Sequence, residues 1–157
     1  MERIKKYQRI LQEMAFKRSE IEQEIRSSDR NRREHLVLCY YLPKHTANNH
    51  WQQEIYADIK DIADRKWKNN NWYLSEKEYL DNLWNKPYEN KDEYEIIDKT
   101  IEGLIYDKYK IPKDWKDEKD DLVISLHNLY QEISKLLSEG KISRLVVYKL
   151  IEKYIIK

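Results

Sequence analysis

Apolar residues recur at helical spacing along almost the whole chain. Within residues 2–26 they follow alternating steps of three and four, at Ile4, Tyr7, Leu11, Met14, Ile21 and Ile25. A stripe of this kind, with Arg18 in its one missing position, predicts a heptad-like amphipathic helix. We expect this helix to be long and partly exposed, so that its stripe can pair with a second copy or with another protein.

Ser27-Ser28-Asp29 interrupts the first stripe and offers N-cap residues for a second helix over about residues 30–42, which Pro43 ends. Later stripes predict further helices that begin near residues 46–49, 75, 91, 117–121 and 144 and end near residues 68, 84, 109, 138 and 156. The last of these is apolar on more than one side. It is therefore either a central buried helix or a surface that docks onto another chain.

Local signals place several of these boundaries. Ser75 and Glu78 have the spacing of a capping box, and Ser143 offers an N-cap for the last helix. Gly140 is expected at a helix C-terminus. Gly103 falls inside a helical stripe, where it weakens the helix or marks a close approach of two helices.

Two glycines and three prolines in 157 residues leave little material for hairpins and tight turns. We therefore predict an all-α, single-domain bundle of about six or seven helices over residues 1–157, with no sheet and a possible seam near residues 85–90. The 13 Tyr and 5 Trp allow a core in a chain that is otherwise very polar.

Composition narrows the function classes. The net charge of +1 favours neither nucleic acid nor an anionic membrane as a general partner. Without a signal peptide or a long apolar run, and with Cys39 as the single cysteine, the cytoplasm is the expected compartment and no membrane contact is expected. The nucleotide-binding and hydrolase motifs that need several glycines are absent, so we expect no cofactor.

Charge is nevertheless unevenly distributed. Residues 1–33 carry a net +4 and residues 75–121 a net −6, whereas the rest from residue 122 carries +3. This pattern describes either ordinary solvated helix faces or a bipolar surface that orients a partner.

The string Arg30-Asn31-Arg32-Arg33-Glu34-His35 has the form Arg-Asn-x-x-x-His at the start of a predicted helix. In these six residues it resembles the active-site motif of HEPN-family ribonucleases, which are small helical proteins. The resemblance implies that Arg30 stabilises a phosphate at a dimer interface, that Asn31 holds the scissile backbone and that His35 acts in acid–base cleavage. Only one helix precedes the motif here, whereas the family usually has a helical hairpin before it.

Two groups of residues on neighbouring predicted helices contain side chains of the types that bind metal ions. The side chains of His35, Cys39, His45 and His50 are acceptable zinc ligands, but their spacing matches no familiar zinc pattern. The acidic residues of the following helix, Glu54, Asp58, Asp61 and Asp64, pair at helical spacing with nearby basic residues and are expected on a solvated face. No metal site is expected.

Aromatic and basic residues alternate between Lys66 and Tyr73. Such a group fits a protein-binding hot spot, a stacking platform for unpaired bases, or two Trp residues that pack a loop. A protein-binding surface would use as anchors Tyr7, Leu11, Met14, Trp67, Trp72 and Trp84, and a nucleic-acid-binding surface would use Arg26, Arg30, Arg32, Arg33, Lys66 and Lys68.

The sequence thus favours a non-enzymatic helical interaction module, such as an adaptor, assembly or inhibitor-type protein, whose partner is another protein or a second copy of itself. A nucleic-acid-binding accessory protein is the first alternative, and a helical ribonuclease that uses Arg30 and His35 is the second.

Overall fold

The computed structural model describes the backbone of residues 2–83 and 91–156, without the side chains of residues 2–4, 7, 10–18, 83, 91 and 92. The described residues form a helical protein without strands, which confirms the all-α bundle. Its elements are α1 (Glu2–Tyr41), α2 (Asn48–Lys68), α3 (Asn70–Leu83), α4 (Lys91–Tyr106), the 3-10 helix η1 (Trp115–Glu118), α5 (Lys119–Glu139) and α6 (Arg144–Tyr154). The expected seam near residues 85–90 and Trp84 lie outside the described residues.

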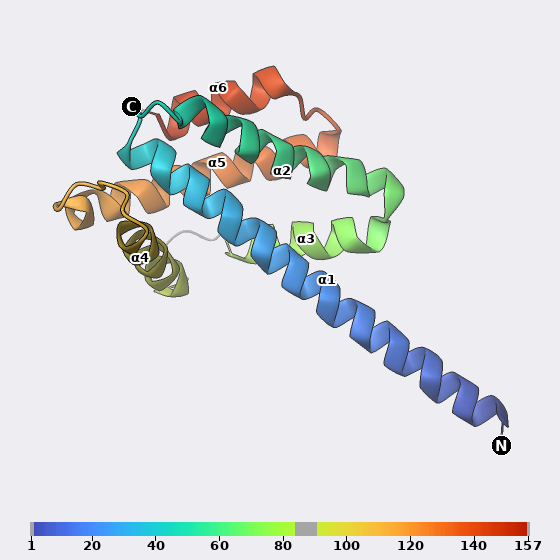
Figure 1. The fold of residues 1–157 in the computed structure, drawn as a ribbon. Coiled ribbons are helices and arrows are strands. Elements are labelled where there is room, and N and C mark those ends of the chain that lie inside the picture. Colours follow the sequence, from blue (N-terminus) through green and yellow to red (C-terminus); the bar gives the residue numbers. More distant parts are fainter. Residues whose placement is uncertain (1, 84–90, 157) are drawn as a thin grey trace.

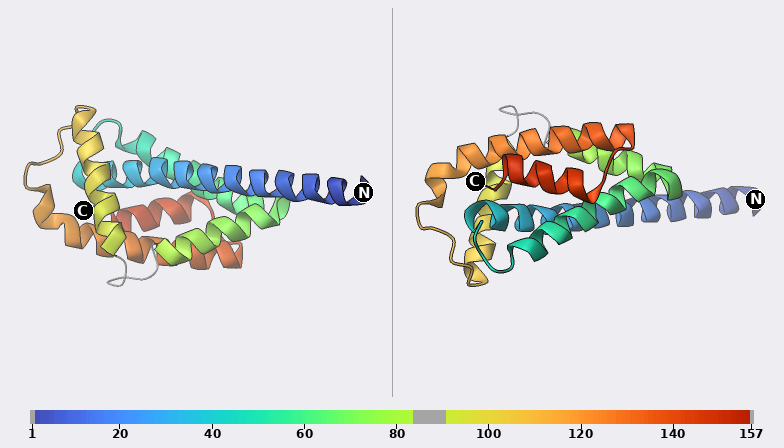
Figure 2. Two further views of the ribbon diagram at one scale, coloured as in Figure 1. Left: turned by 90° about the horizontal axis from the view of Figure 1, so that it is seen from below. Right: turned by 90° about the horizontal axis from the view of Figure 1, so that it is seen from above.

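The bundle is assembled around the second half of α1 (Figure 1). Helix α2 runs back along α1 (Figure 2). Helix α3 follows α2 and contacts α1, α2 and α5, and α6 packs against α2 and α5. Helix α4 crosses one end of the bundle, where it contacts α1 and α5. Apolar residues from every helix form one core, which includes the α2 stripe Trp51, Ile55, Ile59 and Ile62 as expected from its period.

The break expected at Ser27-Ser28-Asp29 is wrong, because α1 continues through it as one helix of 40 residues. Serine and aspartate lower helix propensity only by a few tenths of a kcal/mol each, roughly, which tertiary contacts easily outweigh. The Asp29 carboxylate accepts hydrogen bonds from Arg32, Arg33 and Tyr79. Its role is therefore to hold α1 against other helices.

The capping box at Ser75 and Glu78 is also wrong. Helix α3 begins at Asn70, and the Asn69 side chain accepts a hydrogen bond of 3.2 Å from the backbone N–H of Trp72. The Ser75 hydroxyl lies inside the helix and donates to the carbonyl of Asn71 at 3.0 Å. Asparagine is as good an N-cap as serine, so an earlier cap was available to the chain.

Other boundary signals are confirmed. Gly140 ends α5 with a φ of 67°, and the Ser143 hydroxyl caps α6 by accepting from the N–H of Val146 at 3.3 Å. Gly103 is exposed, and a Cβ built there would meet nothing within 4 Å. Of the two alternatives for Gly103, the close approach of two helices is therefore wrong.

Helix α6 buries one face and leaves the other open. Val147 and Ile151 are buried in the core, whereas Leu145 is 64% exposed. The helix lies between α2 and α5 at the side of the bundle (Figure 2) and is not its centre.

Among the described residues, no helix combines the length and apolar character needed to cross a membrane.

Candidate interaction surface

A buried ionic cluster holds α1 in the bundle. Asp29 is 0% exposed and Arg32 is 1% exposed, and the Arg32 Nη2 donates to Asp29 Oδ1 at 3.2 Å. The Arg32 Nε donates to the hydroxyl of Tyr130 on α5 at 3.0 Å. Burial alone would lower the pKa of Arg32, but Tyr130 and Asp29 outweigh it and raise that pKa. Arg32 is therefore a fixed internal cation.

The same cluster reaches two more helices, α4 through Arg33 and α3 through Asp29. The Arg33 Nη1 donates to Asp29 Oδ2 at 2.7 Å, and its Nε donates to the hydroxyl of Thr100 on α4 at 2.9 Å. The hydroxyl of Tyr79 on α3 donates to the same Asp29 oxygen at 3.1 Å. Side chains of α3, α4 and α5 thus meet α1 within one helical turn, and they fix the direction in which the rest of α1 leaves the bundle.

Acidic residues of α2 and α3 lie within electrostatic range of Arg32. Glu76 receives two hydrogen bonds from Arg65, at 2.7 and 3.3 Å, and its burial raises its pKa. Burial raises the pKa of Asp58 to about 6, against the opposing effect of Arg32. The Asp58 Oδ2 is buried without a hydrogen-bond partner, which corrects the expectation that this acid belongs to a solvated face.

The first half of α1 extends beyond the other helices as a single helix (Figures 1 and 2). Ile25 is 3% exposed and is the first buried side chain of α1 among those described. Before it, the described side chains are exposed except for Ile21, which is half-buried. The stretch from Glu2 to Ile25 spans about 35 Å at the helical rise.

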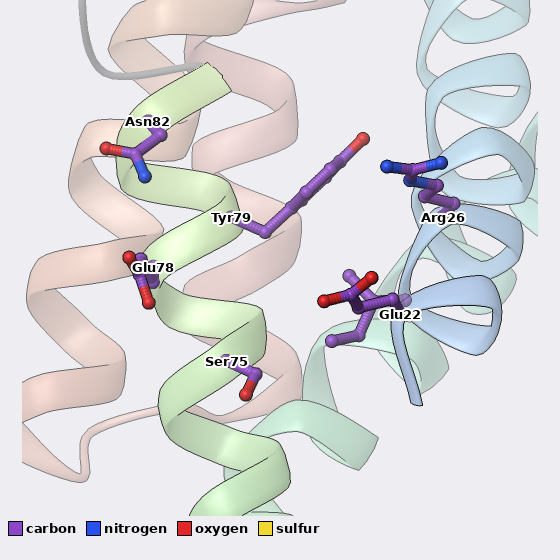
Figure 3. Close-up of a pocket in the computed structure, with 7 residues that line it drawn as sticks. Glu22, Arg26, Ser75, Glu78, Tyr79 and Asn82 are labelled. Carbon is purple, nitrogen blue, oxygen red and sulfur yellow. The ribbon is translucent and has the colours of Figure 1, made fainter. Parts of the chain in front are cut away.

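A polar cleft lies where α1 leaves the bundle (Figure 3). Its volume is about 310 Å³, and Tyr79 points across it from α3 toward Arg26 on α1. Glu22 on α1 and Glu78 on α3 make its lining acidic, with Arg26 as the only basic lining residue among those described. The remaining lining residues are Ile25, Ser75 and Asn82.

The expected protein-binding anchors have different environments. The side chains of Tyr7, Leu11 and Met14 lie outside the described set, although their backbone belongs to α1. Trp67 is 84% exposed at the end of α2. Trp72 is half-buried, with the Arg65 guanidinium 4.4 Å from the centre of its ring. Of these anchors, Trp67 is therefore open to a partner in the isolated chain, and Trp72 is mostly covered.

The expected nucleic-acid-binding set needs a correction at two residues. Arg32 is buried and the Arg33 side chain is 12% exposed, and both are held by Asp29, which removes them from any phosphate-binding surface. Arg26, Arg30 and Lys68 are exposed. Lys66 is half-buried, and its Nζ donates to the carbonyl of Ser138 at 3.3 Å.

The Arg-Asn-x-x-x-His string lies in the interior of α1, not at a helix start. Arg30 is exposed and forms an ion pair of 3.4 Å with Glu34, and Asn31 is exposed as well. Burial lowers the pKa of His35, whose Nδ1 is buried without a hydrogen-bond partner. Because residues five apart on a helix point about 140° away from each other, Arg30 and His35 do not converge within one chain.

The four residues with side chains of zinc-ligand type also lie apart. Cys39 lies in the core, and burial raises the pKa of its thiol to about 12. His45 stacks on Trp51 with ring centres 4.9 Å apart, and the Nε2 of His50 lies 3.8 Å from the Oε1 of Glu54. Within the described part of the chain, no three potential metal-binding side chains come together.

Two buried ionic groups were not predicted from the sequence. The spacing of Asp29 to Arg32 and Arg33, by three and four positions, is the signal that an ion pair along one helix gives. The buried pair of Glu93 on α4 and His127 on α5 joins residues far apart in the chain. No local pattern indicates that pair.

No protein-family model, curated protein or solved structure matches this chain.

Proposed function

We propose that this protein is a non-enzymatic, cytoplasmic interaction module that binds a helix of another protein chain through the first half of α1. The observation that supports the proposal is the departure of α1 from the bundle near Ile25, while its heptad-like stripe continues back to Ile4. Isolated helices are marginal in water, and most helical stability comes from packing of an apolar face. A partner helix supplies such packing.

The length of the stripe is sufficient for specific pairing. Its positions from Ile4 to Ile21 extend over about two and a half heptads, and pairing would bury them as a coiled-coil seam. Buried apolar area contributes about 25 cal/mol per Å², so a few leucine-sized side chains at the seam dominate the affinity. Leu11 and Met14 lie at the middle of the stripe and are the residues to test.

The decisive experiment compares three forms of the full chain. Leu11→Asp/Met14→Asp places two charges in the seam and should abolish both self-association and capture of any partner from the native host. Gln23→Asp is the control, since it adds a charge at an exposed position off the stripe. Association is measured by analytical ultracentrifugation and by affinity isolation, with circular dichroism as the check on helix content.

The proposal is supported if Leu11→Asp/Met14→Asp loses association while the Gln23→Asp control keeps it. A wild-type chain that is monomeric at high concentration, and whose captured proteins are the same in the seam variant, contradicts it.

The exposure of Trp67 supports a second candidate, binding of single-stranded nucleic acid at the end of α2. An 84% exposed indole between Lys66 and Lys68 offers a stacking surface beside two ammonium groups. Binding of a labelled RNA should weaken steeply between 50 and 200 mM salt and should fall further in Trp67→Ala. Absence of retention at low salt eliminates this candidate.

A further inference from the structure

The projecting part of α1 is divided by charge. Residues 1–18 contain six Lys or Arg and two Glu, whereas residues 19–25 contain three Glu and no basic residue. The acidic stretch, Glu20, Glu22 and Glu24, is exposed and lies where α1 enters the bundle. On this basis, and resting on the proposed function, we propose that the partner of α1 is the α1 of a second copy in antiparallel orientation.

Orientation follows from the sign of the charges. A parallel pair would align the basic segment of one helix with that of the other, and the acidic stretch with its own copy. Like charges opposed across an interface cost free energy and suppress that arrangement. An antiparallel pair sets residues 1–6 of each copy, which contain three basic residues and one Glu, against the acidic stretch of the other copy, so the two contacts related by the twofold axis are both attractive.

The register follows from the end of the free stripe. Because Ile25 is already buried in its own bundle, Ile21 is the last stripe position that a partner can share. In an antiparallel seam, the a positions of one helix face the d positions of the other. This sets Ile4 opposite position 21 and Leu11 opposite position 14 of the second copy. Arg18, the one charged stripe residue, then lies opposite Tyr7, whose ring is a favourable partner for a guanidinium.

This register uses the cleft between α1 and α3. With Ile4 opposite position 21, the first turn of one copy lies level with Glu22 of the other, which lines the cleft together with Glu78. Arg3 and Glu24 each directly precede a stripe position, so Arg3 of one copy and Glu24 of the other flank the same side of the seam. The basic first turn of each α1 therefore reaches the acidic cleft of the other copy. The two bundles lie at opposite ends of a two-helix stalk of roughly 25–30 Å, which keeps them apart.

Charge reversal tests both the partner and the orientation. In sedimentation equilibrium on the full chain, Arg3→Glu and Glu24→Lys should each raise the dimer Kd by about tenfold, because each creates two repulsive pairs per dimer. The double variant Arg3→Glu/Glu24→Lys should return to within about threefold of wild type, because both pairs are attractive again. Gln23→Lys adds a positive charge beside Glu24 but off the stripe, and should leave the Kd nearly unchanged.

Each alternative result has a defined meaning. A double variant no tighter than the single variants overturns the antiparallel register. A wild-type chain that stays monomeric, while Leu11→Asp/Met14→Asp still loses a different protein captured from the host, overturns self-pairing and leaves the proposed function standing. A monomer with no capture that depends on Leu11 and Met14 overturns both. Circular dichroism of every variant separates loss of pairing from loss of folding.

Discussion

At Asp29, hydrogen bonds from three side chains converge on a carboxylate that has no contact with solvent. Buried ion pairs are only weak evidence for net stability, because desolvation offsets the attraction between the charges. Removing one partner of such a pair destabilises the protein strongly, since the other charge stays buried without compensation. The Asp29 cluster is therefore best probed by deletion of its anion.

Asp29→Ala should lower the free energy of unfolding by about 3–5 kcal/mol, because it leaves Arg32 as a buried cation without its nearest carboxylate. Urea denaturation measures the change. Arg30→Ala is the matched control on the same helix, where the ion pair with Glu34 is exposed and is worth at most about 1 kcal/mol. Similar effects of the two substitutions would show that the Asp29 cluster does not hold α1.

Asp58 gives a pH dependence of defined sign. Its pKa is raised to about 6 in the folded protein, above its ordinary value of about 3.9, so the native state binds more protons than the unfolded chain between these values. This group therefore makes stability fall as pH rises from about 4 to about 6. Asp58→Asn should remove this fall and stabilise the protein at pH 7 by on the order of 1 kcal/mol. In denaturation series across pH, exposed Asp61→Asn should retain the wild-type slope.

At the scale of the element, the two glycines make opposite demands. Gly103 is exposed inside α4 with free space around its Cβ position, so Gly103→Ala should stabilise the protein by about 0.5–1 kcal/mol. Gly140 has a φ of 67° at the end of α5, so Gly140→Ala should destabilise it by about 1 kcal/mol. Thermal unfolding of both variants checks the pair, and a shift of the same sign in both would contradict this account.

Helix positions were predictable wherever periodicity alone decides them. The stripe of α2 and the end of α5 at Gly140 follow from spacing and from one residue with an unusual φ. The errors arose where one residue type has two local uses. Asp29 serves equally as an N-cap or as an ion-pair partner, and the choice depends on Tyr79, which is distant in the chain. The exposure of Trp67 likewise depends on how α2 meets α3.

In the whole molecule, the two halves of helix α1 lie in different environments. Amides of residues 19–24 lie where the described side chains are mostly exposed, whereas those of residues 36–41 lie in the core. Local opening needs little free energy where few apolar contacts are lost, so hydrogen exchange should be much faster in the first range in dilute solution. At dimer-forming concentrations the first range should become protected. Equal exchange in both ranges at every concentration would contradict the proposed role of α1.

The rigid attachment of α1 also makes it a lever. Its pivot is the cluster of Asp29, Arg32 and Arg33, and its outer end lies about 40 Å away along the helix axis. A tilt of about 10° at the pivot displaces that end by roughly 7 Å, more than the pitch of one helical turn. The positional accuracy of the outer end is therefore set by a few hydrogen bonds inside the bundle, and a substitution in the core can change what the far end reaches.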